Sequence, residues 1–285
     1  MVNASVALVI PTYNAGEAFE NLLTEISLQT VQASCKLLID SSSADTTVKI
    51  AKDFGWEINI IEKSTFSHGG TRRYALDILP YEIDIVIFMT QDIRLPDEKC
   101  FERLLSAFDD CNVGAAYGRQ IGHDGASIYA ATDRNFNYPP VSIIKSMEKI
   151  GTYGIKTAFL SNSFAAYRIN DLRRVGGFPL VDICEDIYTS GKLLLSGRKI
   201  AYVSHAVVKH SHEPELLDLW KRYKAMGCFY RENQWLQETF GTANKEGWKL
   251  LKYQISVCVN NRQFDKIFKF FFLDLVKYVA FRCIL

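Results

Sequence analysis

Polar side chains that could do chemistry stand directly after apolar runs in this chain. The fullest example is Ile85 to Met89, an unbroken series of strand-forming residues that is followed by Gln91 and Asp92. Such a run predicts a strand buried on both faces of a parallel sheet. Ligands bind beyond the carboxyl ends of these strands, where a carboxylate can hold a divalent cation and the cation a diphosphate. The simpler interpretation is that Asp92 only caps a helix beginning near Asp97.

Three further polar clusters follow predicted strands. They are Pro11-Thr12-Tyr13-Asn14, the stretch 40–47 with Asp40, Ser42 and Asp45, and His210-Ser211-His212. Clusters at strand ends converge on one crevice in a doubly wound fold. Taken singly, they could be an ordinary turn, a loop whose Asp45 caps a helix, and a strand end that faces solvent. The adjacent acids Glu185 and Asp186 stand at a predicted helix start, where negative charge is favourable for its own sake.

The elements that must position these residues alternate regularly through the first half of the chain. Strands are expected at 5–10, 36–39, 57–61, 85–89 and 113–117, and helices at 18–29, 45–54, 69–79 and 96–108. This β-α alternation predicts an α/β fold with a parallel, doubly wound sheet. The first strand is expected to stop at Pro11.

The alternation weakens after Gly122. We expect a long functional loop over 122–153 with one short helix near 141–150. Beyond it we expect a strand at 163–168, a helix at 170–175 capped by Asn170, a helix at 185–195, and strands at 199–203 and 206–208. From Glu215 onward the sequence is typical of helices rich in aromatic residues.

Bulk composition excludes several classes of protein. Hydrophobic residues make up 48% of the 285, enough for a large core, and the net charge of +1 argues against nucleic acid as a partner. The seven cysteines are scattered without a C-x-x-C pair, which predicts reduced thiols in a cytosol. The first strand begins at once, so no signal peptide is expected, and no spanning helix is expected either. No G-x-G-x-x-G follows the first strand, which disfavours a dinucleotide-dependent dehydrogenase.

The order of the polar clusters resembles family 2 of the inverting glycosyltransferases. The matching elements, spread over 5–212, are Pro-Thr-Tyr-Asn, the Asp-Ser-x-Ser-x-Asp-Thr motif from Asp40, a strand ending at Asp92, Gly-Gly-Phe at 176–178 and Glu185-Asp186. Within the family, the chain is most similar to bacterial rhamnosyltransferases. That likeness comes from Phe-Ser-His-Gly-Gly-Thr-Arg-Arg at 66–73, Thr90-Gln91-Asp92 and His210-Ser211-His212.

The resemblance implies a GT-A fold over 1–212, followed by a helical region over 213–285. It also implies an enzyme that moves L-rhamnose from dTDP-L-rhamnose onto a growing cell-surface polysaccharide or a lipid-linked oligosaccharide. Two alternatives stay open: a transferase that uses UDP-galactose or UDP-N-acetylglucosamine, and a catalytically silent sugar- or nucleotide-binding subunit. The joint presence of Arg72, Asp92 and Asp186 argues against the silent subunit.

The resemblance also implies roles in donor binding. Thr12 and Tyr13 would line the base pocket, and Asp40 would accept a hydrogen bond from the base or ribose. Arg72, at a helix start, would bind the diphosphate, since its fork of donors and the helix N-terminus both favour anions. The remaining residues expected to contact the donor are Asn14, Ser42, His68, Gln91, Asp92 and Glu185.

Metal binding and catalysis would fall to other residues. Asp92 would bind Mn²⁺ or Mg²⁺, and His212, with His210 less favoured, would complete a coordination that suits Mn²⁺. Asp186 would be the general base that takes the proton of the acceptor hydroxyl. The chain departs from the family's Asp-x-Asp motif, because Thr90 stands where the first acid is usual. Metal binding would then be weaker, rely on His212, or be replaced by the charge of Arg72.

The last segment, 267–285, is dense in aromatic residues and is flanked or interrupted by Lys266, Lys269, Lys277 and Arg282. This composition suits a helix that lies in the interface of a membrane. Packing on the catalytic domain or in a homodimer interface explains it equally well. We therefore expect a cytoplasmic protein, with peripheral contact to the inner face of the cell membrane as an open alternative.

Overall fold

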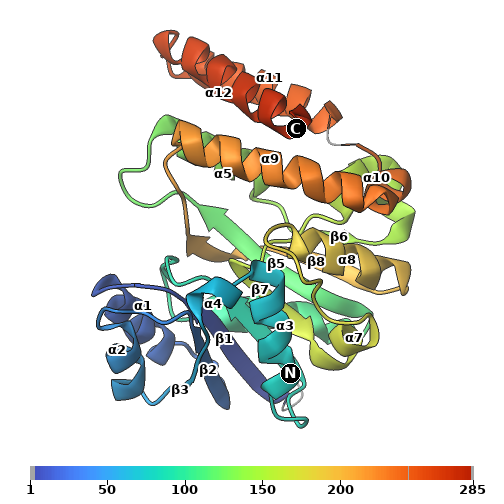
Figure 1. Ribbon diagram of the computed structural model, residues 1–285. Helices are drawn as coiled ribbons and strands as arrows, with labels where there is room; N and C mark the ends of the chain where they lie inside the picture. Colours follow the sequence, from blue (N-terminus) through green and yellow to red (C-terminus); the bar gives the residue numbers. More distant parts are fainter. Residues whose placement is uncertain (1–3, 243, 284–285) are drawn as a thin grey trace.

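The computed structural model of the protein describes residues 4–242 and 244–283. An eight-stranded sheet in the order β3-β2-β1-β4-β7-β5-β8-β6 forms its centre (Figure 1). The strands are β1 (Val6–Thr12), β2 (Cys35–Asp40), β3 (Glu57–Ile60), β4 (Ile85–Met89), β5 (Val113–Ile121), β6 (Ile143–Lys145), β7 (Phe164–Arg168) and β8 (Lys199–Lys209). Only β7 and β6 run antiparallel to their neighbours, so the predicted, mostly parallel α/β sheet is confirmed.

Helices cover both faces of this sheet. They are α1 (Ala18–Ser27), α2 (Thr47–Asp53), α3 (His68–Ile78), α4 (Cys100–Leu105), α5 (Ile128–Asn137), α6 (Ile150–Tyr153), α7 (Ile169–Arg174) and α8 (Glu185–Leu195). Alternate residues of β1 enter opposite cores: Leu8 packs in one cluster with Phe19 of α1, and Val9 in the other with Leu76 of α3. Burial on both faces explains why the central strands are continuous apolar runs.

The predicted helix near 141–150 is wrong. Strand β6 occupies Ile143–Lys145 and pairs antiparallel with β8, while the longer helix of this segment, α5, lies earlier. Two consecutive β-branched isoleucines favour an extended backbone once β8 offers an edge to pair with. Helix α5 starts where Ser127 Oγ accepts the Ala130 N–H at 3.3 Å. This N-cap is hard to recognise in the sequence because the neighbouring residues are also polar.

Two predicted boundaries also need correction. Strand β1 continues through Pro11, which pairs with Ile39 of β2. Pairing with β4 extends only to Val9, so Pro11 lies where a missing N–H is tolerated, as on an edge strand. Asn170 does not cap α7, because β7 runs directly into this helix with Arg168 at the N-cap position.

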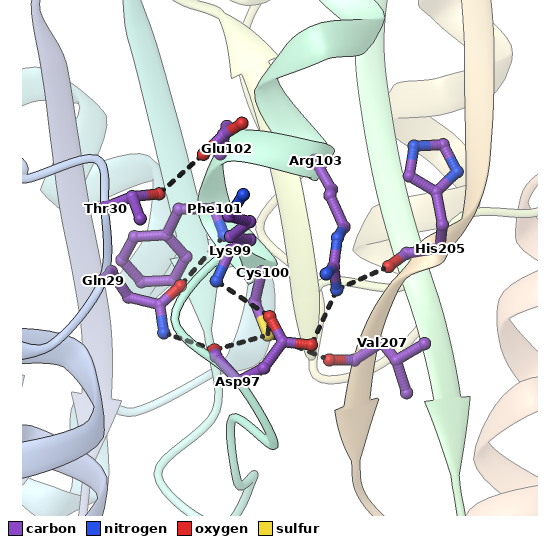
Figure 2. Close-up of polar contacts among 10 residues, drawn as sticks. All are labelled: Gln29, Thr30, Asp97, Lys99, Cys100, Phe101, Glu102, Arg103, His205 and Val207. Atoms are coloured by element: carbon purple, nitrogen blue, oxygen red, sulfur yellow. Dashed lines mark hydrogen bonds and ion pairs between the residues drawn. The ribbon is translucent and has the colours of Figure 1, made fainter.

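The start of α4 is held by Asp97 (Figure 2). Its carboxylate accepts the Lys99 N–H at 2.8 Å and pairs with Arg103 at 2.7 Å, while its backbone oxygen accepts from Gln29 at 2.8 Å. Helix α4 therefore begins at Cys100, four residues after Pro96, and not at 96–97 as expected. These contacts fix the end of the short segment 92–97, which begins at Asp92.

The chain ends in a helical layer (Figure 1). It contains α9 (Leu216–Glu232), α10 (Gln234–Phe240), α11 (Asn244–Asn260) and α12 (Asp265–Arg282). Helix α12 runs close along α9, since a Cβ on Gly227 would lie 2.2 Å from the Phe281 oxygen. Within the described residues, no helix combines the length and apolarity needed to cross a membrane. Ile284 and Leu285, the end of the predicted aromatic segment, lie outside these residues.

Candidate active site

The loops after β1, β2 and β4 are tied together at the carboxyl edge of the sheet. The Gln91 side chain accepts the Tyr13 N–H at 2.8 Å and donates to the Tyr13 oxygen at 3.1 Å. Asn14 donates its N–H to Ser43 Oγ at 2.8 Å and accepts the Ala44 N–H at 2.9 Å. The expected convergence of Tyr13, Asn14 and Gln91 is therefore present, with Gln91 and the Asn14 side chain bonded to the backbone of neighbouring loops.

Asp40 is fully buried in this loop cluster. Its carboxylate accepts from Thr12 Oγ1 at 2.9 Å, from the Ser43 N–H at 2.8 Å and from Ser43 Oγ at 2.6 Å. Ser42 has φ 59° and donates its hydroxyl to the Ile61 oxygen at 2.8 Å. In this structure Thr12, Asp40 and Ser42 thus shape the loop through bonds to the chain itself, and their contacts with a base or ribose stay predictions.

Lys63 is a residue that the sequence reasoning missed. Its Nζ donates to the Tyr13 hydroxyl at 2.6 Å and lies 4.2 Å from the centre of the Tyr13 ring. It follows β3 on one turn of 3₁₀ helix, with no surrounding motif to mark it. The structure therefore adds a cation to the expected base pocket.

Asp92, His210 and His212 form a compact group that could hold a metal ion. The Asp92 carboxylate lies 3.3 Å from His210 Nε2 and 3.2 Å from His212 Nε2, and the potential ligand atoms are all within 4.8 Å of one another. One carboxylate and two imidazoles fit a transition ion such as Mn²⁺ better than Mg²⁺. Sequence reasoning favoured His212 over His210, whereas the structure places both beside Asp92.

The charge states in this group suit a cation. Burial would raise the pKa of the Asp92 carboxyl, but the adjacent imidazoles of His210 and His212 hold that pKa well below its usual range. Burial lowers the pKa of His210, which keeps this imidazole neutral. The group thus offers an ionised oxygen and at least one neutral nitrogen.

Gln120, which the sequence reasoning also missed, orients His210. Its side-chain oxygen lies 2.8 Å from His210 Nδ1 and accepts from Arg134 at 2.9 Å, while its amide nitrogen donates to Ser161 Oγ at 2.9 Å. An acceptor at this position places the imidazole proton on Nδ1 and leaves the lone pair of Nε2, the nitrogen nearest Asp92, available to a metal ion. Only the tertiary structure brings Gln120 to His210.

A second polar network surrounds the start of α8. Arg72 is 2% exposed and lies 3.1 Å from Glu185 Oε1, which also accepts from Asn162 at 2.9 Å. Tyr167 in turn donates its hydroxyl to Asn162 at 2.6 Å. The guanidinium of Arg72 is thus directed at Glu185, and its predicted contact with a diphosphate stays a prediction.

His68 closes the other side of this network. Arg72 donates to the His68 backbone oxygen at 3.1 Å, and its Nη1 lies 3.4 Å from His68 Nδ1. Burial, followed by the charge of Arg72, lowers the pKa of His68. A neutral imidazole therefore lies beside the buried ion pair of Arg72 and Glu185.

Asp186, the predicted base, follows directly and is half-buried. Burial, and then the neighbouring Glu185 carboxylate, raise the pKa of Asp186 to about 7, while Arg72 and Arg222 of α9 oppose the rise. Cys184, just ahead, holds a left-handed backbone with φ 67°, a strained conformation that is often found at functional sites. A carboxyl with a pKa near neutrality is suited to accept and release a proton.

Comparison with known proteins decides the family. The model of glycosyl transferase family 2 matches residues 7–176. The chain belongs to glycosyl transferase family 2. It is therefore a glycosyltransferase, and the family and enzyme class predicted from its motifs are confirmed.

Two curated members of the family are similar along most of this chain. The O-antigen chain rhamnosyltransferase WbaN of Salmonella anatum is 42% identical over 262 residues, which cover 91% of this chain and 83% of WbaN. The O-antigen chain rhamnosyltransferase RfbN of Salmonella typhimurium is 40% identical over 261 residues, with the same coverage.

Solved structures of similar fold have low sequence identity. The mannosyltransferase PcManGT from Pyrobaculum calidifontis, in complex with GDP-Man and Mn²⁺, has a TM-score of 0.67 at 14% identity, covering 96% of this chain and 85% of its own. S. aureus TarS 1–349 in complex with UDP-GlcNAc has a TM-score of 0.61 at 16% identity, covering 87% and 71%. These neighbours confirm the predicted GT-A fold.

Proposed function

We propose that the protein transfers L-rhamnose from dTDP-L-rhamnose, with inversion, to a growing polysaccharide of the O-antigen type. The observation that carries this proposal is the identity of 42% and 40% to two O-antigen chain rhamnosyltransferases along 91% of the chain. A lipid-linked acceptor would bring the reaction to the inner face of the cell membrane.

Asp186 is the proposed general base. It takes the proton of the acceptor hydroxyl as that oxygen attacks the anomeric carbon from the face opposite the diphosphate. The new glycosidic bond forms as the bond from the sugar to the diphosphate breaks, and dTDP departs with the electron pair. The raised pKa supports the role, because a group that titrates near the working pH transfers protons most effectively.

Asp92, His210 and His212 are the proposed ligands of a divalent ion, with Mn²⁺ preferred over Mg²⁺ on the chemistry of two imidazole donors. When bound, the ion would neutralise charge on the departing diphosphate. Tyr13 and Lys63, which contact each other, would bind the base, and Glu185, paired with Arg72, would orient the helix start that carries Asp186.

A panel of nucleotide sugars tests the proposal. With Mn²⁺ present, dTDP-L-rhamnose is expected to raise the unfolding temperature most, and a lipid-linked acceptor is expected to trigger release of dTDP. Stronger stabilisation and turnover with UDP-galactose or UDP-N-acetylglucosamine would assign a different donor. Stabilisation without release of nucleotide for any acceptor would favour the catalytically silent subunit.

A further inference from the structure

Helix α12 exposes an apolar face to solvent. This outer face consists of Phe264, just before the helix, and Phe268, Phe271, Phe272, Leu275, Tyr278 and Val279. Phe268 is 78% exposed, and every other member is at least 42% exposed. Spacings of three and four residues place all seven on one side of the helix. A soluble helix normally turns polar residues to that side.

The opposite side of α12 is already packed. Phe270, Leu273, Lys277 and Ala280 are buried, and the Phe270 ring lies 4.7 Å from that of Tyr129 on α5. Figure 1 shows α12 and α11 together beyond α9, at the end of the molecule away from α1 and α2. On helix α11, Trp248 is also exposed, at 68%. No described element covers the outer face.

The charges of the hairpin formed by α11 and α12 are mostly positive. Its exposed cations include Lys252, Arg262 and Arg282, while Lys269 lies 4.5 Å from the centre of the Tyr129 ring, toward the packed side of α12. The acidic residues of the hairpin all form ion pairs with lysines: Glu246 with Lys156 and Lys249, Asp265 with Lys266, and Asp274 with Lys277. Arg282 continues the spacing of the apolar stripe, so a cation stands at the end of the outer face itself.

We propose that the outer face of α12 docks onto the surface of an anionic lipid bilayer, with its aromatic side chains in the headgroup region and its basic rim on the lipid charges. Exposed aromatic residues beside lysine and arginine are the composition that such interfaces select. A second copy of the chain fits less well, because two identical faces would bring like-charged rims together without acids to pair with them. The proposal rests on the proposed function only for the presence of a lipid-linked acceptor.

One helix connects the docking hairpin to the candidate active site. On α5, Asp133 accepts from Lys277 Nζ at 2.9 Å, and the next residue, Arg134, donates to Gln120, the partner of His210. Tyr129 of the same helix contacts Phe270. A protein bound through α12 would therefore hold its metal group at a fixed position relative to the lipid surface.

Vesicle flotation of the full-length protein tests the docking surface. Wild type is expected to bind phosphatidylcholine vesicles that contain phosphatidylglycerol, to bind more weakly as salt rises, and to bind pure phosphatidylcholine poorly. The double variant Phe268→Ser, Phe271→Ser should lose at least about tenfold in affinity, since both side chains are exposed and free to insert. Lys252→Gln with Arg282→Gln should reduce the dependence on phosphatidylglycerol and on salt.

The matched control is Leu28→Ser with Tyr81→Ser, two exposed apolar residues outside the hairpin, and it should bind like wild type. Equal binding by wild type and Phe268→Ser, Phe271→Ser would overturn the proposal, as would a wild-type dimer that this variant converts to a monomer. Stabilisation by dTDP-L-rhamnose is measured on the same samples. Binding to vesicles without stabilisation by dTDP-L-rhamnose would contradict the proposed function but not the docking surface. Stabilisation by dTDP-L-rhamnose without binding to vesicles would contradict the docking surface but not the proposed function.

Discussion

Single residues of the candidate site owe their chemical state to partners distant in the sequence. Asp186 is protonated more readily than an ordinary carboxyl because it is half-buried beside Glu185, which Arg72 and Asn162 hold in place. His210 can present the lone pair of Nε2 to a metal because Gln120 accepts a hydrogen bond from Nδ1, the ring nitrogen that carries the proton. Neither state is a property of the residue type, so changing the partner should change the chemistry.

Replacing the proposed base should separate activity from stability. Asp186→Asn keeps the shape of the side chain but cannot accept a proton, so turnover should fall at least about 10²-fold with donor affinity nearly unchanged. In wild type, turnover should fall as the pH drops below about 7, because the base becomes protonated. Steady-state kinetics measured at several pH values check the turnover, and calorimetry with the donor checks the donor affinity. Transfer at the wild-type rate would rule Asp186 out.

The same substitution should stabilise the fold at alkaline pH. The folded state raises the pKa of Asp186 to about 7 and so binds its proton more tightly than the unfolded chain. The free energy of unfolding therefore falls as the pH rises from about 4 to about 7, through the two pKa values. At a pH above that window, Asp186→Asn should unfold at least about 2 °C above wild type in calorimetry.

Removing the partner of His210 should weaken metal binding. Gln120→Leu leaves the Nδ1 proton without its acceptor, so Mn²⁺ affinity should fall about 10- to 100-fold, as for other outer partners of metal ligands. Titration of free Mn²⁺ by electron paramagnetic resonance measures this directly. Asp92→Ala should abolish binding, and Gln234→Leu on the exposed side of α10 should have no effect. Unchanged affinity in Gln120→Leu, beside loss in Asp92→Ala, would contradict the orienting role.

At the scale of elements, close backbone contacts place the start of α8. Helix α3 touches the loop ahead of α8 through Gly69, whose N–H donates to the Val181 oxygen at 2.9 Å. A Cβ on Gly69 would lie 1.9 Å from the Pro179 oxygen, so only glycine fits. This contact brings the Arg72 of α3 to the Glu185 of α8, and it explains the first glycine of the Gly-Gly pair in the middle of a polar motif.

Adding one methyl group at this contact should disturb both stability and catalysis. Gly69→Ala forces α3 away from the loop at 179–181, which should cost about 1–3 kcal/mol in the free energy of unfolding and lower turnover by misplacing Asp186. Gly247→Ala is the control, because its Cβ meets nothing within 4 Å in helix α11 and alanine favours helix there. Urea unfolding of both variants decides. If Gly69→Ala were as stable as Gly247→Ala, the loop at 179–181 would be free to move away from α3.

At the scale of the whole molecule, a polar contact joins the helical hairpin to the catalytic part. Lys277 is 7% exposed and pairs with Asp133 of α5 at 2.9 Å and with Asp274 at 3.1 Å. Burial disfavours its charge, but Tyr223, Asp133 and Asp274 together raise the pKa of Lys277. Lys277, one of the four cations that the sequence analysis considered for membrane contact, is therefore buried inside the protein.

Removing this cation should loosen the hairpin. Lys277→Met leaves Asp133 and Asp274 facing each other without a positive charge, and the free energy of unfolding should fall by at least about 1 kcal/mol. Hydrogen exchange should accelerate in α11 and α12 more than in β1 or β4. Lys52→Met, on the exposed side of α2, is the control. Uniform exchange rates in both variants would show that the apolar contacts alone hold the hairpin.

The sequence by itself determined the features that depend on neighbours along the chain. The apolar run of β4 and the polar residues after it are local signals, and the predicted bounds 85–89 agree with the structure. Helix α8 likewise runs from Glu185 to Leu195 as predicted, because its acidic start, apolar spacing and terminal Gly197 lie within one short segment. The order of such motifs was enough to identify the family.

Tertiary structure alone decided what depends on residues far apart. Residues 143–145 form a strand and not a helix because β8, more than 50 residues later, offers them an edge. Gln120 orients His210, Lys63 reaches Tyr13, and Lys277 is buried against Asp133, all through contacts between distant segments. Periodicity shows which residues share a side of an element, but only packing decides which side is covered, and this is why the exposed aromatic face of α12 became visible in the folded chain.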